Sequence, residues 1–198
     1  MNVCPARLTS CDTLTRKLPP GITPDQCQRA QYSGHKHKHG IKFHALVSPS
    51  GMVAHLFGPI DGRRHDSFML TESGILPLLT GLLHYLVYAD SAYPITPNLL
   101  GPIAQVEAPP GSVAARLNEI MAIPRTVTSE WLYGIVTNTF QTLDFKRWQR
   151  QWCTAPALQY FAAVFLTNCR TCLEGGNQIS RFFQCSPPDL GDYLSGHF

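Results

Sequence analysis

Leu82-Leu-His-Tyr-Leu-Val-Tyr-Ala-Asp90-Ser-Ala-Tyr-Pro94 is the stretch that decides the fold. Its first eight residues are almost entirely apolar and predict a buried strand that ends in a single carboxylate, Asp90. A carboxylate at the mouth of such a strand suits metal chemistry, because the backbone fixes the ligand while the loop leaves room for a substrate. The same residue also fits an ordinary turn before Ser-Ala-Tyr-Pro. From this stretch alone, both interpretations stand.

The composition indicates one globular domain. The chain has 198 residues, of which 44% are hydrophobic, and this is enough to bury a core. Seven cysteines, an odd number without a secretory leader, indicate a reducing compartment instead of a disulfide framework. No apolar stretch is long enough and free enough of charge to cross a bilayer. We therefore expect a soluble, intracellular protein that makes no membrane contact.

The net charge is only +3, but the basic residues are unevenly placed. They form two groups, Arg29, Lys36, Lys38 and Lys42, and Lys146, Arg147 and Arg150. Such groups suit a polyanionic partner, although solvated surface explains most basic clusters equally well.

The order of predicted elements indicates an α/β fold. Residues 1–28 are weakly patterned and prolines interrupt them, so we expect a poorly ordered or damaged first-strand region before a domain at 29–194. Next, a hairpin closed by Gly58-Pro59 is predicted, then a helix, the strand that ends at Asp90, a loop and three helices. The expected bounds are His39–Ser48 and Met52–Phe57 for the hairpin, Asp66–Gly74 for the first helix, Pro94–Gly111 for the loop, and Ser112–Met121, a helix from Thr126, and Pro156–Leu173 for the later helices.

The helix from Thr126 carries the second carboxylate of interest. Its apolar residues recur at helical spacing and predict one buried stripe made of Val127, Trp131, Leu132, Ile135, Val136, Phe140 and Leu143. Glu130 lies off that stripe, with Gly134 one turn further along the same side. A small residue there predicts a close approach to a strand end, which would bring Glu130 towards it. An ordinary solvent-facing glutamate is the alternative.

The residues around these elements carry a family resemblance. Four segments appear in a characteristic order: Ser33-Gly-His-Lys36 with Lys42-Phe43, Leu56-Phe-Gly-Pro-Ile-Asp-Gly-Arg-Arg-His-Asp66, Tyr88-Ala-Asp-Ser-Ala-Tyr-Pro94, and Ser129-Glu-Trp-Leu-Tyr-Gly134. Together with Leu143-Asp-Phe-Lys146, Asn168-Cys-Arg-Thr-Cys172 and Pro187-Pro188 with Tyr193, they resemble DDE-type transposases of the PIF/Harbinger group and the endonuclease domains derived from them. The resemblance implies a ribonuclease-H-like core, a mixed sheet with an antiparallel hairpin flanked by helices.

The resemblance also implies a catalytic triad of two aspartates and a glutamate that binds two divalent cations, Mg²⁺ or Mn²⁺, for phosphodiester cleavage. Asp90 matches the second aspartate and Glu130 the glutamate. For the first, the candidate is Asp12, which lacks the glycine that follows it in the family. The residues before Asp12 predict a poor central strand, since Pro5 and Arg7 lie in it. Asp66 is therefore the second candidate for the first aspartate.

The implied substrate is DNA and the implied location is the nucleus. Candidate DNA contacts are His35, Lys36, Lys42, Arg63, Arg64 and Lys146. Members of the family carry a DNA-binding region before the nuclease, so this chain resembles an N-terminally truncated catalytic domain that would need a separate DNA-binding protein. Two functions stay open: an active metal-dependent endonuclease, or an inactive remnant that binds nucleic acid or protein. The two functions differ in whether the site is catalytically active, and this depends on Asp12, whose motif departs from the family pattern.

Three features have competing explanations. His35, His37 and His39 alternate along an extended segment and would suit a zinc-binding module, or a polar strand start. Cys169-x-x-Cys172 has zinc spacing within an apolar helix, which favours packing. Trp131 and Trp148 would suit base stacking, but Trp131 falls on the predicted buried stripe.

Overall fold

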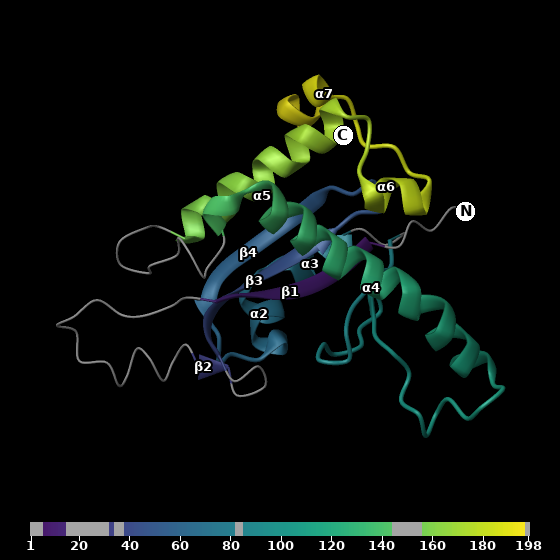
Figure 1. The fold of residues 1–198 in the computed structure, drawn as a ribbon. Helices are drawn as coiled ribbons and strands as arrows, with labels where there is room; N and C mark the ends of the chain where they lie inside the picture. Colours follow the sequence, from purple (N-terminus) through teal and green to yellow (C-terminus); the bar gives the residue numbers. More distant parts are fainter. Residues whose placement is uncertain (1–5, 15–31, 34–37, 82–84, 144–155, 197–198) are drawn as a thin grey trace, which may run out of the picture.

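The computed structural model describes residues 6–14, 32–33, 38–81, 85–143 and 156–196, and it has a mixed sheet between two layers of helices (Figure 1). The strands are β1 (Ala6–Leu14), β2 (Tyr32–Ser33), β3 (Lys38–Val47), β4 (Val53–Asp61), β5 (Val87–Tyr88) and β6 (Leu99–Leu100). The helices are α2 (Asp66–Glu72), α3 (Ile75–Gly81), α4 (Val113–Thr139), the 3₁₀ turn η1 (Gln141–Leu143), α5 (Pro156–Leu173), α6 (Gln178–Phe183) and α7 (Leu190–Ser195).

Strand β1 lies inside the sheet. It pairs antiparallel with β3 from Arg7 to Leu14 and parallel with β5 at Ala6 and Arg7. Strand β4 pairs antiparallel with the other side of β3, β6 runs parallel to β5, and β2 pairs with the start of β3. The main path is therefore β4, β3, β1, β5 and β6.

The opening strand differs from the sequence expectation. A damaged or displaced strand was expected, yet the backbone of β1 is paired on both sides. The strand as described begins at Ala6, and Pro5 lies outside the described residues. Arg7 lies near the start of the strand, next to the short β5. The remaining part of 1–28, residues 1–5 and 15–28, lies outside the described residues.

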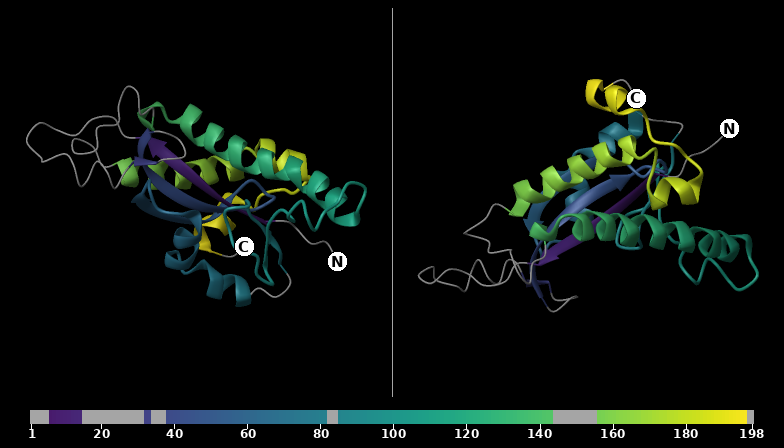
Figure 2. Two further views of the ribbon diagram at one scale, coloured as in Figure 1. Left: turned by 90° about the horizontal axis from the view of Figure 1, so that it is seen from below. Right: turned by 45° about the horizontal axis from the view of Figure 1, so that its top comes forward.

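Alternation along β3 separates two cores, one on each face of the sheet. Phe43 packs on the face covered by α4 and α5, where its ring stacks on Tyr160 at 4.3 Å between centroids. Leu46 points to the opposite face, against α2 and α3. Figure 2 (left) shows the sheet between these two helical layers. The full sets are Ile41, Phe43, Ala45, Val47, Val53, Leu132, Val136, Leu143, Tyr160, Ala163, Val164 and Ile179 on one face, and Leu46, Leu70, Ile75, Leu79, Val87, Ala89, Tyr93 and Leu99 on the other.

The predicted hairpin is confirmed, but Gly58-Pro59 does not close it. The β4 strand continues to Asp61, and the ladder with β3 shifts register between Lys42 and His44. A bulge tolerates a proline, because its missing N–H is not needed for the ladder there. Gly58 has φ +142°, and a Cβ on it would lie 2.7 Å from the carbonyl oxygen of Lys42. Glycine is therefore required by contact as well as by backbone angle.

The later elements agree with the sequence in type more than in extent. Helices α2 and α5 are confirmed, but α3 and β6 were not predicted, and the strand before Asp90 is reduced to Val87–Tyr88. The two helices expected at Ser112–Met121 and from Thr126 form one helix, α4, with Pro124 inside it. Its first half projects beyond the sheet (Figure 1), so solvent can satisfy the carbonyl that Pro124 leaves unbonded. No helix in the described ranges has the length and hydropathy needed to span a membrane.

Candidate active site

Asp90 lies where β5 leaves the sheet and enters a turn. Its side chain is exposed, and its Oδ1 accepts a hydrogen bond from the backbone N–H of Ser91 at 2.8 Å. The N–H of Tyr93 donates to the carbonyl of Asp90 at 3.0 Å and closes the turn. The backbone therefore holds this carboxylate at the rim of the sheet, where solvent and a cation can reach it.

The strand that carries Asp12 runs beside the strand that leads to Asp90. Because β1 and β5 are parallel, both strands run towards the same edge of the sheet. Asp12 occupies the register position opposite Lys42 on β3. The side chain of Asp12 lies outside the described residues. The structure thus places its backbone in the strand next to β5 and gives no distance between the two carboxylates.

Lys42 is engaged by Asp66, the reserve candidate for the first catalytic position. The Nζ of Lys42 lies 3.4 Å from Oδ1 of Asp66, and both side chains are largely buried, at 14% and 17% exposed. The same ammonium donates to the carbonyl of Arg64 at 3.0 Å. Asp66 therefore begins α2 and offsets the charge of a lysine that stands opposite the position of Asp12. The ammonium of Lys42, a predicted DNA contact, is therefore engaged in contacts within the protein.

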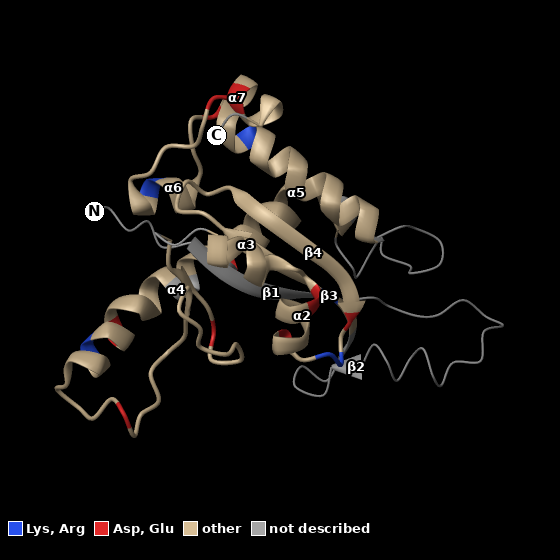
Figure 3. Cartoon of the chain, turned by 180° about the vertical axis from the view of Figure 1, so that it is seen from behind, with Lys and Arg blue, Asp and Glu red and all other residues tan. Residues whose placement is uncertain are grey.

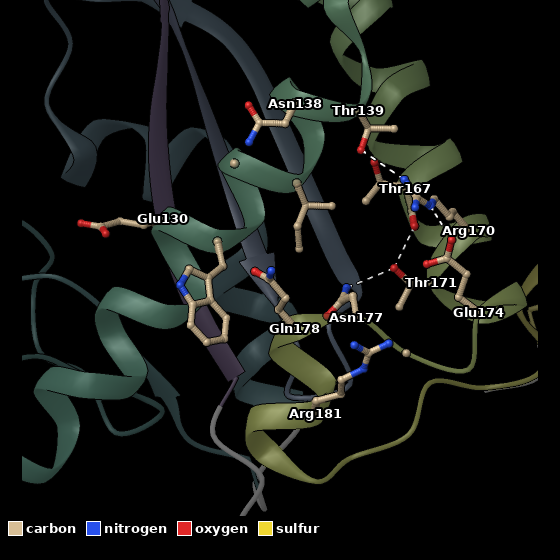
Figure 4. A pocket seen from close by; sticks show the side chains of 14 residues that line it. Glu130, Asn138, Thr139, Thr167, Arg170, Thr171, Glu174, Asn177, Gln178 and Arg181 are labelled. Carbon is tan, nitrogen blue, oxygen red and sulfur yellow. Dashed lines mark hydrogen bonds and ion pairs between the residues drawn. The ribbon is translucent and has the colours of Figure 1, made fainter.

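Glu130 is exposed on α4, which packs against β1. It lies at the rim of a cleft of about 470 Å³ between α4, α5 and α6. Figure 4 shows its side chain pointing away from the group of Thr167, Arg170 and Thr171 across the cleft. Among the described residues, no close approach is seen at Gly134: a Cβ there would meet the side-chain nitrogen of Asn138, at 3.9 Å. Packing of the buried stripe, including Leu132 and Val136, positions Glu130 instead.

Two described basic candidates, Arg63 and Arg64, lie in the turn between β4 and α2, where Figure 3 shows basic residues near acidic ones. Arg63 and Arg64 are exposed there, and the guanidinium carbon of Arg64 lies 4.6 Å from the centroid of the Phe68 ring. A shallow open cleft of about 510 Å³ follows this turn and the first turns of α2. The other basic candidates, His35, Lys36 and Lys146, lie outside the described residues.

Beneath the Asp90 turn lies a histidine that the sequence analysis missed. His44 is fully buried on β3, and its ring stacks on Tyr93 at 5.5 Å between centroids. Neither ring nitrogen of His44 has a hydrogen-bond partner in the described part of the chain. Burial, with a smaller contribution from His55 nearby, lowers the pKa of His44 to about 4. Its alternation with Phe43 and Ala45 is the signal that could have identified a buried histidine.

Within the described residues, no three His, Cys, Asp or Glu side chains are grouped so that they could hold a metal ion. Asp12 and the histidines at positions 35, 37 and 39 have side chains outside that set, so the triad and the zinc hypothesis both stay predictions. Cys169 and Cys172 are free thiols on α5. The Sγ of Cys172 lies 3.8 Å from the Sδ of Met52, and burial raises the pKa of this thiol, as packing would.

Comparison with known proteins identifies the family of this chain. The family model described as DDE superfamily endonuclease matches residues 19–168, a range that includes Asp90 and Glu130 and begins after Asp12. No curated protein and no solved structure matches the chain. The family implies a nuclease or transposase-like function on DNA, and its members generally use divalent metal ions. Since the match covers most of the chain, including β3 to β6 and all of α4, the chain belongs to the DDE superfamily endonucleases.

Proposed function

We propose that this protein is a metal-dependent DNA endonuclease whose site consists of Asp12, Asp90 and Glu130. The observation that carries the proposal is the arrangement of three elements: β1 is parallel to β5, Asp90 follows β5 directly, and α4 with Glu130 packs on β1. The strand order β4, β3, β1, β5, β6, with β3 antiparallel to its neighbours, supports a ribonuclease-H-like core. Within the family, the motifs favour the PIF/Harbinger group.

The donor set fits Mg²⁺ or Mn²⁺. Both ions prefer hard oxygen ligands, and Asp90 and Glu130 are exposed carboxylates, one after β5 and one on α4, two elements that each contact β1. Asp12, Asp90 and Glu130 would hold the ions, which when bound activate the attacking oxygen and stabilise the leaving oxygen of a phosphodiester. The Ser91 N–H contributes by fixing one oxygen of Asp90, so that the rotamer of this ligand is set before binding.

Arg63 and Arg64 are the described residues best placed to contact the DNA backbone, because both are exposed beside an open cleft. His35, Lys36 and Lys146 are proposed contacts on sequence grounds. Lys42 has a different role in this proposal: its ion pair with Asp66 orders the start of α2. A nuclear location follows from the same proposal, as it does for eukaryotic members of the group.

Nicking of supercoiled plasmid with Mg²⁺ or Mn²⁺ tests the function. We expect Asp90→Asn and Glu130→Gln to lower the nicking rate by at least about 100-fold, since each removes a charged ligand of the metal site. Asp192→Asn is the matched control, because Asp192 is an exposed carboxylate on α7 away from the site. Equal nicking by wild type, Asp90→Asn and Asp192→Asn would refute the proposed site. Asp12→Asn and Asp66→Asn then decide which residue is the first aspartate.

One observation favours the second function, an inactive remnant that only binds. Lys42 stands opposite the position of Asp12, and directly opposed residues of an antiparallel pair interact through their side chains. Although Lys42 is paired with Asp66, a lysine at this register position would compete with a metal for the carboxylate of Asp12. If purified wild type binds DNA but does not nick it with either metal, and Lys42→Met does not restore nicking, the remnant function is supported over the nuclease.

A further inference from the structure

The cleft beside Glu130 has chemistry that the metal site does not use. It lies between α4, α5 and the start of α6, and its volume of about 470 Å³ is in the range of small-molecule sites and too small for a duplex. Its wall includes one aromatic ring, three side-chain amides and two arginines. These are Trp131, Asn138, Asn177, Gln178, Arg170 and Arg181.

The two arginines differ in how much of their charge is available. Arg170 donates from Nε to Glu174 at 2.7 Å and from Nη1 to Thr139 at 3.4 Å, so its guanidinium is already matched. Arg181 is exposed and forms no ion pair with any residue that the structure describes. Figure 4 shows Arg181 reaching from α6 towards Asn177 on the same side of the cleft as Gln178. Arg181 is therefore the cation that a ligand in this cleft would meet.

Trp131 is the aromatic wall. It is only half-buried, although its position on the apolar stripe predicts core, and its ring meets Phe182 edge to face at 6.1 Å. The Phe182 ring therefore holds the indole of Trp131 on one side, and Trp131 still lines the cleft. Asn138 and Gln178 are exposed amides on facing helices, each with a donor and an acceptor. The amide of Asn177 is already used within the fold. Its oxygen caps α6, and its nitrogen donates to the carbonyl of Gly51 and the hydroxyl of Thr171.

An aromatic ring, amides that pair with base edges and one unmatched guanidinium form the combination that recognises an unpaired nucleotide. The ring stacks on a base, the amides bond its edge, and the arginine meets a phosphate. The cleft adjoins Glu130, one residue before the aromatic wall. We propose that this cleft binds an unpaired nucleotide of the DNA substrate next to the site of cleavage. This inference rests on the proposed nuclease function, whose substrate it describes in more detail.

Binding of a fluorescein-labelled 12-nucleotide oligo(dT), followed by anisotropy in EDTA, tests the cleft without any metal. We expect Arg181→Ala to weaken binding about tenfold, the size expected for losing a charged hydrogen bond. Arg116→Ala is the matched control, since Arg116 is an exposed arginine on the projecting half of α4 and should change binding less than about twofold. Equal weakening by the two variants would mean that only general charge is involved, and would overturn the proposal.

An oligonucleotide of the same length with abasic sites tests base recognition. Wild type should bind it about tenfold more weakly than oligo(dT), and Trp131→Leu should lose this preference, because stacking on one base contributes at this level. If wild type binds both oligonucleotides equally, the cleft does not bind a base and the inference fails. Wild type that shows the expected binding pattern without nicking plasmid would refute the nuclease function alone. Wild type that nicks while its binding ignores Arg181 and the bases would refute the cleft alone.

Discussion

The buried histidine beneath the Asp90 turn should make the stability of this protein depend on pH. His44 is fully buried against Tyr93, and its pKa is lowered to about 4 from an ordinary value of 6.5. Between these two values the unfolded state binds a proton that the folded state does not bind. The free energy of unfolding is therefore fully retained above pH 6.5 and falls as the pH decreases towards 4.

The size of the effect follows from the two pKa values of His44. At pH 5 the unfolded state is almost fully protonated at this residue and the folded state hardly at all, which lowers the free energy of unfolding by about 2 kcal/mol relative to pH 8. His55 shifts in the same direction, because burial lowers its pKa as well. A loss of this size is a large part of the stability of a typical domain.

Urea unfolding at pH 8 and pH 5 measures this loss directly. We expect His44→Leu, which has a similar volume and no proton to bind, to remove about 2 kcal/mol of the pH dependence. Leu46→Met is the control, since Leu46 is buried on the same strand, has no ionisable group and should leave the pH dependence unchanged. If His44→Leu and wild type lose the same free energy between pH 8 and pH 5, the assignment of the effect to His44 is refuted.

Two further predictions concern positions that hold the fold. Asn168 is buried on α5, where its amide bonds both the N–H and the carbonyl of Val53, at 2.9 and 3.0 Å. Asn168→Leu should lower the free energy of unfolding by about 4 kcal/mol, because it leaves both backbone groups unpaired. A loss below about 1 kcal/mol in urea unfolding would contradict this prediction. Gly58→Ala should destabilise by more than about 2 kcal/mol because of its contact with Lys42. Gly134→Ala, on a helix where the new Cβ makes an ordinary contact with Asn138 at 3.9 Å, should stabilise by up to about 1 kcal/mol. The opposite order of these two melting temperatures would contradict the packing described for both.

The agreement between sequence and structure is greatest where a pattern is local. The alternation in β3, the turn after it and the apolar faces of α4 and α5 each follow from residues close together in the chain. Agreement ends at contacts between distant segments. Pro5 and Arg7 taken alone predict a poor strand, whereas pairing with β3 from Arg7 to Leu14 makes β1 a strand.

For the candidate site, the sequence by itself identified the residues that we propose for the chemistry: Asp90 at a strand end and Glu130 off an apolar stripe, both within an ordered set of motifs. Only the tertiary structure decided what surrounds them. It placed β1 beside β5, paired Lys42 with Asp66, buried His44 beneath the Asp90 turn and opened a cleft between Glu130 and α6. The physical reason is that residue type and periodicity are local properties, whereas ion pairs, desolvation and clefts arise between segments far apart in the chain, whose packing no local pattern contains.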